Sequence, residues 1–147
     1  MEESKPIGVY LTLLGKHFKT SVHEECDKVN INGTYSSIIM VLSRNKEGIS
    51  QNMIAERSRL AGPTVSLTLR NMEQEGLIEK CVCSNDSRKV IVKLTKKGLE
   101  IDEKIGECFR KVEEQMEKDI SKEEILQFKN IINKMTLNLG YEVIKDV

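Results

Sequence analysis

The residues best suited to chemistry in this sequence are polar and cationic side chains gathered in two short segments. Residues 64–70 include Thr64, Ser66 and Arg70, and residues 86–89 read Asp-Ser-Arg-Lys. Hydroxyl and guanidinium groups of this kind hydrogen-bond to phosphate oxygens and to base edges. Neither segment pairs a nucleophile with a general base, which covalent catalysis requires. The two segments therefore favour binding of a polyanion over catalysis.

Enzyme motifs are absent from the chain as a whole. The sequence contains no G-x-S-x-G, G-x-G-x-x-G, P-loop or H-E-x-x-H motif. Two histidines and four cysteines include no C-x2-C pair, and His23 with Cys26 leaves a metal site short of ligands. We therefore expect no enzyme, no metal site and no cofactor.

The four cysteines, at positions 26, 81, 83 and 108, are too sparse for a disulfide framework. Cys26 and Cys108 are interpreted as core residues, because a buried thiol behaves as a small hydrophobic side chain. Cys81 and Cys83 share one face of an expected strand, where a disulfide between them would be strained.

Length and composition indicate one folded domain. The chain has 147 residues, of which 39% are hydrophobic and 31% charged. Since a single core accommodates up to about 250 residues, we expect one domain over residues 1–147. No apolar run approaches the ~18 residues of a membrane span, and the N-terminus lacks a signal-peptide pattern. These features predict a cytoplasmic protein without membrane contact.

The zero net charge hides an uneven distribution. Residues 44–97 carry eleven Lys and Arg against six Asp and Glu, whereas the other residues carry twelve against seventeen. A basic middle between acidic flanks is expected when only the middle meets a polyanion.

Apolar residues spaced by three and four predict long helices on both sides of this middle. The first spans residues 7–29, a fifth follows Thr95, and a sixth follows a capping box from Ser121 to Glu124 and ends at Gly140. The sixth has an apolar stripe: Ile125, Phe128, Ile132, Met135 and Leu139. Because soluble monomers seldom expose such faces, we expect a homodimer.

Three short helices and a hairpin are expected between them. Thr34 caps one helix, Ser50 caps a second over residues 51–58, and a third over residues 63–75 ends at Gly76. The period then changes to two, which predicts strands at 77–83 and 90–94 around a turn at 84–87. Val90, Val92 and Leu94 should face the core. The expected fold is mainly α with a two-stranded β wing: a winged helix-turn-helix at about residues 34–97, between dimerisation helices at about 6–30 and 98–140.

The helix over residues 63–75 can be presented to a DNA major groove. Val65, Leu69 and Met72 form its core face. Its other face carries the candidate DNA contacts: Pro63, Thr64, Ser66, Leu67, Arg70 and Asn71. The alternative is the ordinary polar face of a helical bundle.

The hairpin adds Arg88 and Lys89 near its tip. Arg88 can enter a minor groove, where narrow A·T-rich segments attract a guanidinium. Asp86 can orient Arg88 through a charge-assisted hydrogen bond. The alternative is an exposed ion pair of little energetic value.

Together these segments resemble the MarR family of transcriptional regulators. The resemblance rests on Gly76-Leu77-Ile78, Asp86-Ser87-Arg88 and Leu94-Thr95-Lys96-Lys97-Gly98, with Pro63-Thr64-Val65-Ser66 upstream. It implies a homodimer that binds double-stranded DNA at a pseudo-palindromic operator. It also implies a repressor that a small lipophilic ligand, a metal or thiol oxidation releases from DNA.

The resemblance has two departures and one open question. Many members have a Ser or Asn N-cap where this chain has Ala61, and peroxide-sensing members have their cysteine near Thr12 rather than Cys26. A ligand pocket would be lined by four candidates, each alternatively a core residue: Tyr10, His17, Met40 and Phe109. A thiol-responsive regulator or a protein-interaction module with the same fold is the alternative function.

Overall fold

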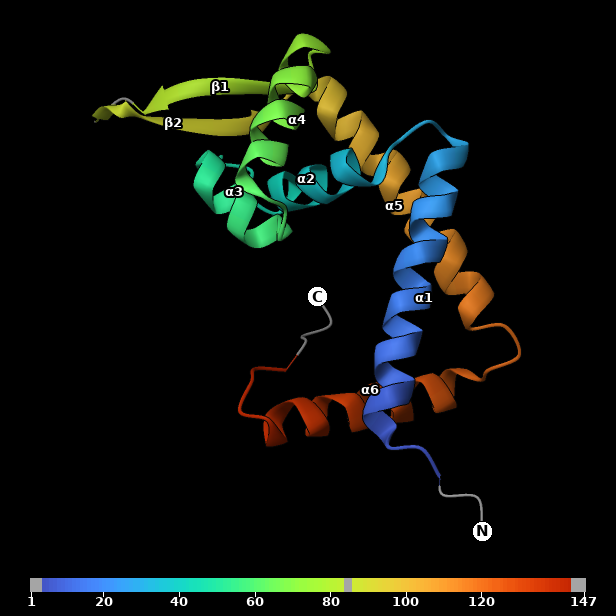
Figure 1. Cartoon of the computed structure of the whole chain (residues 1–147). Coiled ribbons are helices and arrows are strands. Elements are labelled where there is room, and N and C mark those ends of the chain that lie inside the picture. Colours follow the sequence, from blue (N-terminus) through green and yellow to red (C-terminus); the bar gives the residue numbers. More distant parts are fainter. Residues whose placement is uncertain (1–3, 84–85, 144–147) are drawn as a thin grey trace. The chain divides into compact units, whose positions relative to one another are not determined.

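The computed structural model describes residues 4–83 and 86–143 and is mainly helical, as expected. Figure 1 shows helices α1 (Ile7–Lys28), α2 (Gly33–Ser43), α3 (Gln51–Ser58), α4 (Gly62–Gln74), α5 (Lys96–Met116) and α6 (Lys122–Asn138). Strands β1 (Ile78–Cys83) and β2 (Asp86–Leu94) form an antiparallel two-stranded sheet. The predicted fold class, a helical protein with a β wing, is confirmed.

The chain divides into two compact units at Val112. The first contains α1 to α4, the hairpin and most of α5, and the second contains the end of α5 with α6. The candidate interface described below lies entirely in the first unit. A single domain over the whole chain stays a prediction.

Local capping signals explain where several helices begin. The Ser50 hydroxyl accepts from Met53 N at 3.3 Å at the start of α3, and the Thr95 hydroxyl accepts from Gly98 N at 3.2 Å at the start of α5. Ser121 and Glu124 form the predicted reciprocal capping box. The cap of α2 was predicted wrongly. Asn32 rather than Thr34 caps it, because the Asn32 carboxamide reaches Tyr35 N at 2.9 Å and the helix already begins at Gly33.

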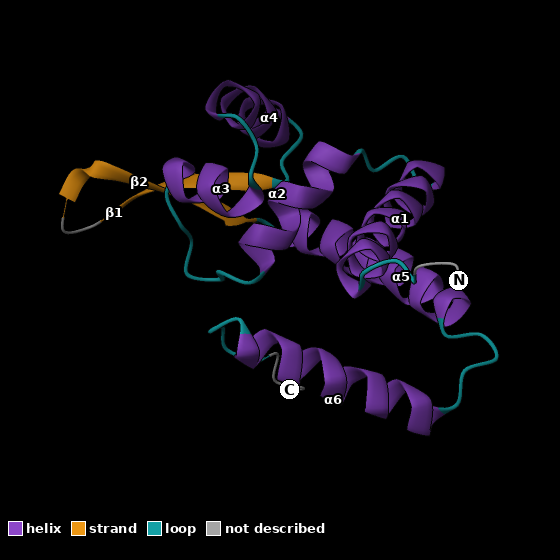
Figure 2. Ribbon diagram, turned by 60° about the horizontal axis from the view of Figure 1, so that its bottom comes forward, coloured by secondary structure: helices purple, strands orange, loops and turns teal. Residues whose placement is uncertain are grey.

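The core of the first unit lies where α2, α3, α4 and the base of the hairpin meet. Its fully buried side chains include Ile38, Ile54, Leu69, Met72 and Val92. Figure 2 shows the hairpin extending beyond α3, away from this core. The core therefore holds α4 and the hairpin base in a fixed relation.

The hairpin is longer than the alternation in sequence predicts. β2 begins at Asp86 rather than Val90, with Cys83 opposite Asp86 and a register shift after Val82. The predicted turn at 84–87 therefore included strand residues, and residues 84–85 lie outside the described part. Val90 is 44% exposed rather than buried, because this part of the strand projects beyond the body that covers Val92.

A further pairing was not foreseen. Ile49, just before α3, exchanges two backbone hydrogen bonds with Val92, at 3.2 and 2.8 Å. It joins the base of the hairpin to the start of α3. A single residue has no periodicity, so the sequence pattern carries no signal for it.

α6 has no buried residue, although its sequence is amphipathic. Phe128 is 46% exposed and Leu126 is 57% exposed. The first half of α1 is similar, with Ile7, Tyr10 and Leu13 about half exposed or more. Each of these two helices, considered by itself, has an uncovered apolar face.

Candidate nucleic-acid interface

α3 and α4 form a helix-turn-helix. Arg59 follows the last residue of α3 as its C-cap, and its φ of 57° places it in the left-handed region. The short connection Leu60-Ala61 then leads into α4. A non-glycine residue in that conformation is uncommon and marks a tight reversal. The reversal separates the two helices while the core residues Ile54 and Leu69 hold them together.

α4 has one buried face and one exposed face, as predicted. Val65, Leu69 and Met72 are completely buried. Thr68 is also buried, and its hydroxyl donates to Thr64 O at 2.7 Å, so it is unavailable to a ligand. Ser66, on the other face, is half-buried. The remaining predicted contact residues on that face are exposed: Pro63, Thr64, Leu67, Arg70 and Asn71.

The start of α4 lacks a side-chain cap. Ala61 occupies the N-cap position without a side-chain hydrogen bond, and Pro63 lies in the first turn. Proline suits this position because its missing N–H would have no partner there. The first N–H groups of a helix have no partner within the helix itself, and a helix N-terminus favours an anion.

The hairpin carries the second group of predicted contacts. Lys89 is exposed on β2. Asp86 and Arg88 belong to β2 by their backbone, but their side chains lie outside the description. The expected orientation of Arg88 by Asp86 stays a prediction.

A hollow of about 420 Å³ lies between the hairpin and the start of α3. It is lined by Ser50, Gln51 and Asn52 from the helix start and by Lys89, Val90 and Ile91 from β2. Gln51 and Asn52 are not among the contacts predicted from the sequence. The predicted N-cap at Ser50 could have indicated them, because it places the side chains of Gln51 and Asn52 beside the first backbone N–H groups of a helix.

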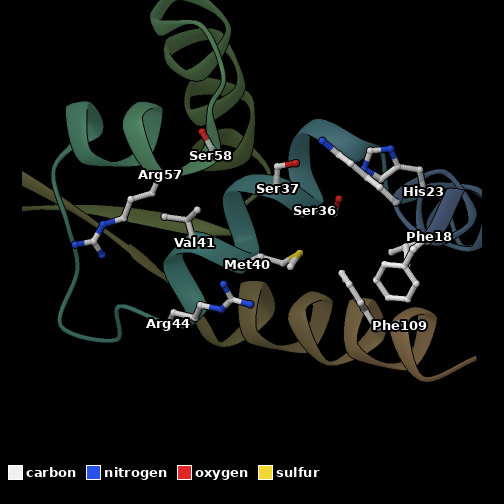
Figure 3. A pocket seen from close by; sticks show the side chains of 12 residues that line it. Phe18, His23, Ser36, Ser37, Met40, Val41, Arg44, Arg57, Ser58 and Phe109 are labelled. Atoms are coloured by element: carbon white, nitrogen blue, oxygen red, sulfur yellow. The ribbon is translucent and has the colours of Figure 1, made fainter. Parts of the chain in front are cut away.

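A second cavity, of about 290 Å³, lies between α1, α2, α3 and α5 (Figure 3). Phe18 and Phe109 lie at one side with ring centroids 5.8 Å apart, and Met40 lies near them. Lys19, Arg44 and Arg57 also line the cavity, and none of the described residues that line it carries a carboxylate.

Two of the four predicted pocket residues, Met40 and Phe109, line this cavity, and Tyr10 and His17 do not. His17 is exposed because it lies about 100° around α1 from Phe18, which faces the cavity. Tyr10 is 55% exposed and lies two turns nearer the N-terminus. Phe18 was not among the candidates, although it follows the three- and four-residue spacing of the apolar residues Leu11, Leu14 and Val22 on the same helix.

The buried thiols of Cys26 and Cys108 meet between α1 and α5. Burial, together with a hydrogen bond to Cys108, raises the pKa of Cys26 to about 12. Both are buried, which confirms their interpretation as core residues, and Cys81 is half-buried. Within the described part of the chain, no three His, Cys, Asp or Glu side chains gather as a metal site would require.

None of the described helices combines the length and the apolar character that crossing a bilayer requires.

Comparison with known proteins agrees with the helix-turn-helix and wing. A model of the MarR family matches residues 29–89. The HTH-type transcriptional regulator FarR of Neisseria gonorrhoeae is 28% identical over 109 residues, which are 74% of each chain.

Solved structures extend the similarity over nearly the whole chain. MepR, a transcription regulator of the Staphylococcus aureus multidrug efflux pump MepA, is 26% identical with a TM-score of 0.76, covering 92% of this chain and 99% of that one. A MepR mutant bound to an oligodeoxyribonucleotide matches with a TM-score of 0.63. MarR of E. coli has the same fold, with a TM-score of 0.78 at 17% identity over 90% of this chain and 98% of that one. The chain is therefore similar to the MarR family of transcriptional regulators, most directly over residues 29–89, and it has the fold of MepR, of which a mutant has been solved with an oligodeoxyribonucleotide.

Proposed function

We propose that the chain is a homodimeric repressor that binds a pseudo-palindromic operator through α4 and the hairpin, and that a small anionic molecule releases it. The observation that carries the proposal is the division of α4, with three apolar side chains completely buried and Thr64, Leu67 and Arg70 exposed on the other side. A helix held this way by the core can enter a major groove without losing its packing.

The exposed groups of α4 suit different parts of DNA. Leu67 is 58% exposed, and such a side chain can contact a thymine methyl group. Thr64 can donate to a phosphate or a base, and Arg70 can reach a guanine or a phosphate. The DNA complex of a MepR mutant supports DNA as the ligand.

The uncovered apolar faces of α1 and α6 support the homodimer. Ile7 and Leu13 on α1, and Leu126 and Phe128 on α6, are each close to half exposed or more. A second copy of the chain would cover these faces and place two α4 helices on one DNA duplex. In such a dimer the half-sites lie about one helical turn apart, roughly 34–36 Å.

The effector is inferred from the cavity lined by Phe18 and Phe109. The two rings suit the apolar body of a ligand, and Lys19 and Arg44 suit a carboxylate or another anion, whereas the Arg57 guanidinium donates to Asn45 Oδ1. MepR has been solved with ethidium, which is a cation. The cations around the present cavity disfavour such a ligand, because like charges repel.

The thiol-responsive alternative receives no support from the buried cysteines. Reactivity requires a thiolate that solvent can reach, whereas Cys26 is completely buried and its pKa is raised.

Selection of bound fragments from genomic DNA, followed by binding to a randomised half-site library, tests the proposal. Wild-type protein should enrich a pseudo-palindrome. Leu67→Ala should change the preferred base at one position of each half-site, and Arg70→Ala should do so if Arg70 contacts a base. Lys118→Ala, which removes an exposed charge outside the first unit, serves as the control. Failure to enrich any sequence would overturn the proposal. Uniform loss of affinity in both α4 variants would instead assign specificity to DNA shape.

A further inference from the structure

The two ends of α4 are held very differently. The first end has no side-chain cap at Ala61, and a Cβ at Gly62 would meet nothing within 4 Å. The other end is tied to three elements. The candidate DNA contacts lie mostly toward the uncapped first end, called the free end below, so the contacts at the tied end, together with the buried core face, set the direction in which the helix points.

Several contacts converge at this tied end. The Lys97 ammonium donates to Glu75 O at 2.8 Å, and the Thr95 hydroxyl donates to Gly76 O at 2.5 Å. Lys80 on β1 forms an ion pair with Glu73 at 3.2 Å. These contacts join α4 to the hairpin and α5, which are the next elements along the chain.

One contact instead reaches an element far away in the sequence. The Tyr35 hydroxyl on α2 donates to Glu75 Oε1 at 2.7 Å, across 40 residues. The donor is firmly placed, since the Tyr35 ring packs against the core and its backbone N–H bonds to Asn32 Oδ1 at 2.9 Å. The Tyr35 ring and its hydrogen bond to Glu75 therefore connect α2 to the end of α4, and this connection is called the strut below.

We propose that Tyr35, acting through Glu75, is a positioning residue that sets the orientation of α4 for operator recognition. This inference rests on the proposed DNA-binding role of α4. α4 has 13 residues, so at 1.5 Å per residue it is close to 20 Å long. A tilt of about 5° at the tied end would therefore move the free end by about 1.7 Å, which is enough to break hydrogen bonds to bases.

The same turn of α2 links this strut to the effector cavity. Ser36 and Ser37 directly follow Tyr35 and line the cavity, and both hydroxyls bond to Gly33 O, at 3.0 and 2.9 Å. A molecule in the cavity touches the turn that holds the strut. Tyr35 thus connects the end of α4 to a turn of α2 that also lines the cavity.

The first test measures specificity. Tyr35→Phe keeps the ring and removes only the hydroxyl, and it should lower affinity for the selected operator roughly 3- to 10-fold while affinity for unrelated DNA stays within about twofold. Glu75→Ala should have the same effect, and the double variant should lose no more than either single variant. Glu75→Gln keeps an acceptor oxygen and should remain near wild type. Tyr141→Phe, at an exposed tyrosine, is the matched control.

The second test does not depend on DNA. Hydrogen exchange of the backbone amides of residues 71–77 should quicken several-fold in Tyr35→Phe, with the amides of α6 unchanged. Unchanged exchange there, or equal losses of affinity on operator and unrelated DNA, would overturn the positioning role. If the wild-type protein shows no operator preference, the proposed function fails, and the exchange result still decides whether Tyr35 holds α4.

Discussion

Gly98 lies so close to Leu77 that a Cβ on residue 98 would come within 2.2 Å of the Leu77 carbonyl oxygen. Leu77 follows the end of α4, and Gly98 lies in the first turn of α5. The Thr95 hydroxyl, which caps α5, also bonds to Gly76 O at 2.5 Å. The Thr-x-x-Gly spacing therefore joins the start of α5 to the turn that leads into the hairpin.

Gly98→Ala should destabilise the protein by about 2 kcal/mol or more, because backbone atoms must move to admit the methyl group. Gly106→Ala, in the same helix, is the matched control. The nearest atom to a Cβ there is 3.6 Å away, so this variant should gain roughly 0.5–1 kcal/mol from helix propensity. Urea unfolding followed by circular dichroism measures both. Equal stabilities of the two variants would contradict the close approach.

Arg88→Ala should weaken operator binding by roughly 1–3 kcal/mol and reduce the salt dependence by about one counterion per subunit. Asp86→Ala should cost less, and almost nothing once Arg88 is absent, if Asp86 acts by orienting the guanidinium. A double-mutant cycle from fluorescence anisotropy at several salt concentrations gives these values. Purely additive effects would remove the orienting role of Asp86.

Sedimentation equilibrium at micromolar concentration should give about twice the chain mass of 16.8 kDa. Phe128→Glu should shift the protein toward monomer, because it places a charge on the apolar face of α6. Asn130→Glu adds the same charge to an exposed polar position of the same helix and should leave the dimer intact. A wild-type monomer at this concentration would contradict the dimer and, with it, the pseudo-palindromic operator.

1-Naphthoate should bind the cavity lined by Phe18 and Phe109 and reduce operator affinity, whereas the 1-naphthylmethylammonium cation should do neither. Arg44→Gln should weaken naphthoate binding roughly fivefold or more, since it removes a charge-assisted hydrogen-bond donor. Arg110→Gln, an exposed residue outside the lining, is the matched control. Calorimetric titration measures binding. Preference for the cation would reverse the assigned ligand class.

The stability of the protein should fall as the pH rises from about 9 toward 12. Burial and the hydrogen bond to Cys108 raise the pKa of Cys26 from 9.0 to about 12. The unfolded chain therefore loses this proton before the folded chain does, so the stabilisation is complete below pH 9 and is lost toward pH 12. Cys26→Ser should show a shallower decline in chemical unfolding across this range. Identical slopes in the two proteins would contradict the raised pKa.

Reaction with a thiol reagent at pH 8 measures how accessible the thiols of Cys26 and Cys108 are in the folded protein. Cys81, which is half-buried, should react well before Cys26 and Cys108, and unfolding in guanidinium should make all four thiols reactive. Rapid reaction of Cys26 in the folded protein would revive the thiol-responsive alternative.

Much of the architecture was determined by local pattern. The spacing of Val65, Leu69 and Met72 predicted the buried face of α4, and all three are completely buried. Ser50, Thr95 and Ser121 predicted three helix starts, and each forms its cap. Caps and helix faces involve residues three or four apart, so the sequence itself contains both partners of each interaction.

Other features depended on residues far apart along the chain. The strut from Tyr35 to Glu75, the pairing of Ile49 with Val92, and the contact of Cys26 with Cys108 have no spacing that a local pattern can show. The cavity also draws on four helices, so the pattern of the first helix alone did not distinguish Phe18, which lines the cavity, from Tyr10 and His17, which do not. Sequence periodicity determined which face of each helix is apolar, and only tertiary packing decided which side chains from different elements meet, because those contacts form when separate faces are buried together.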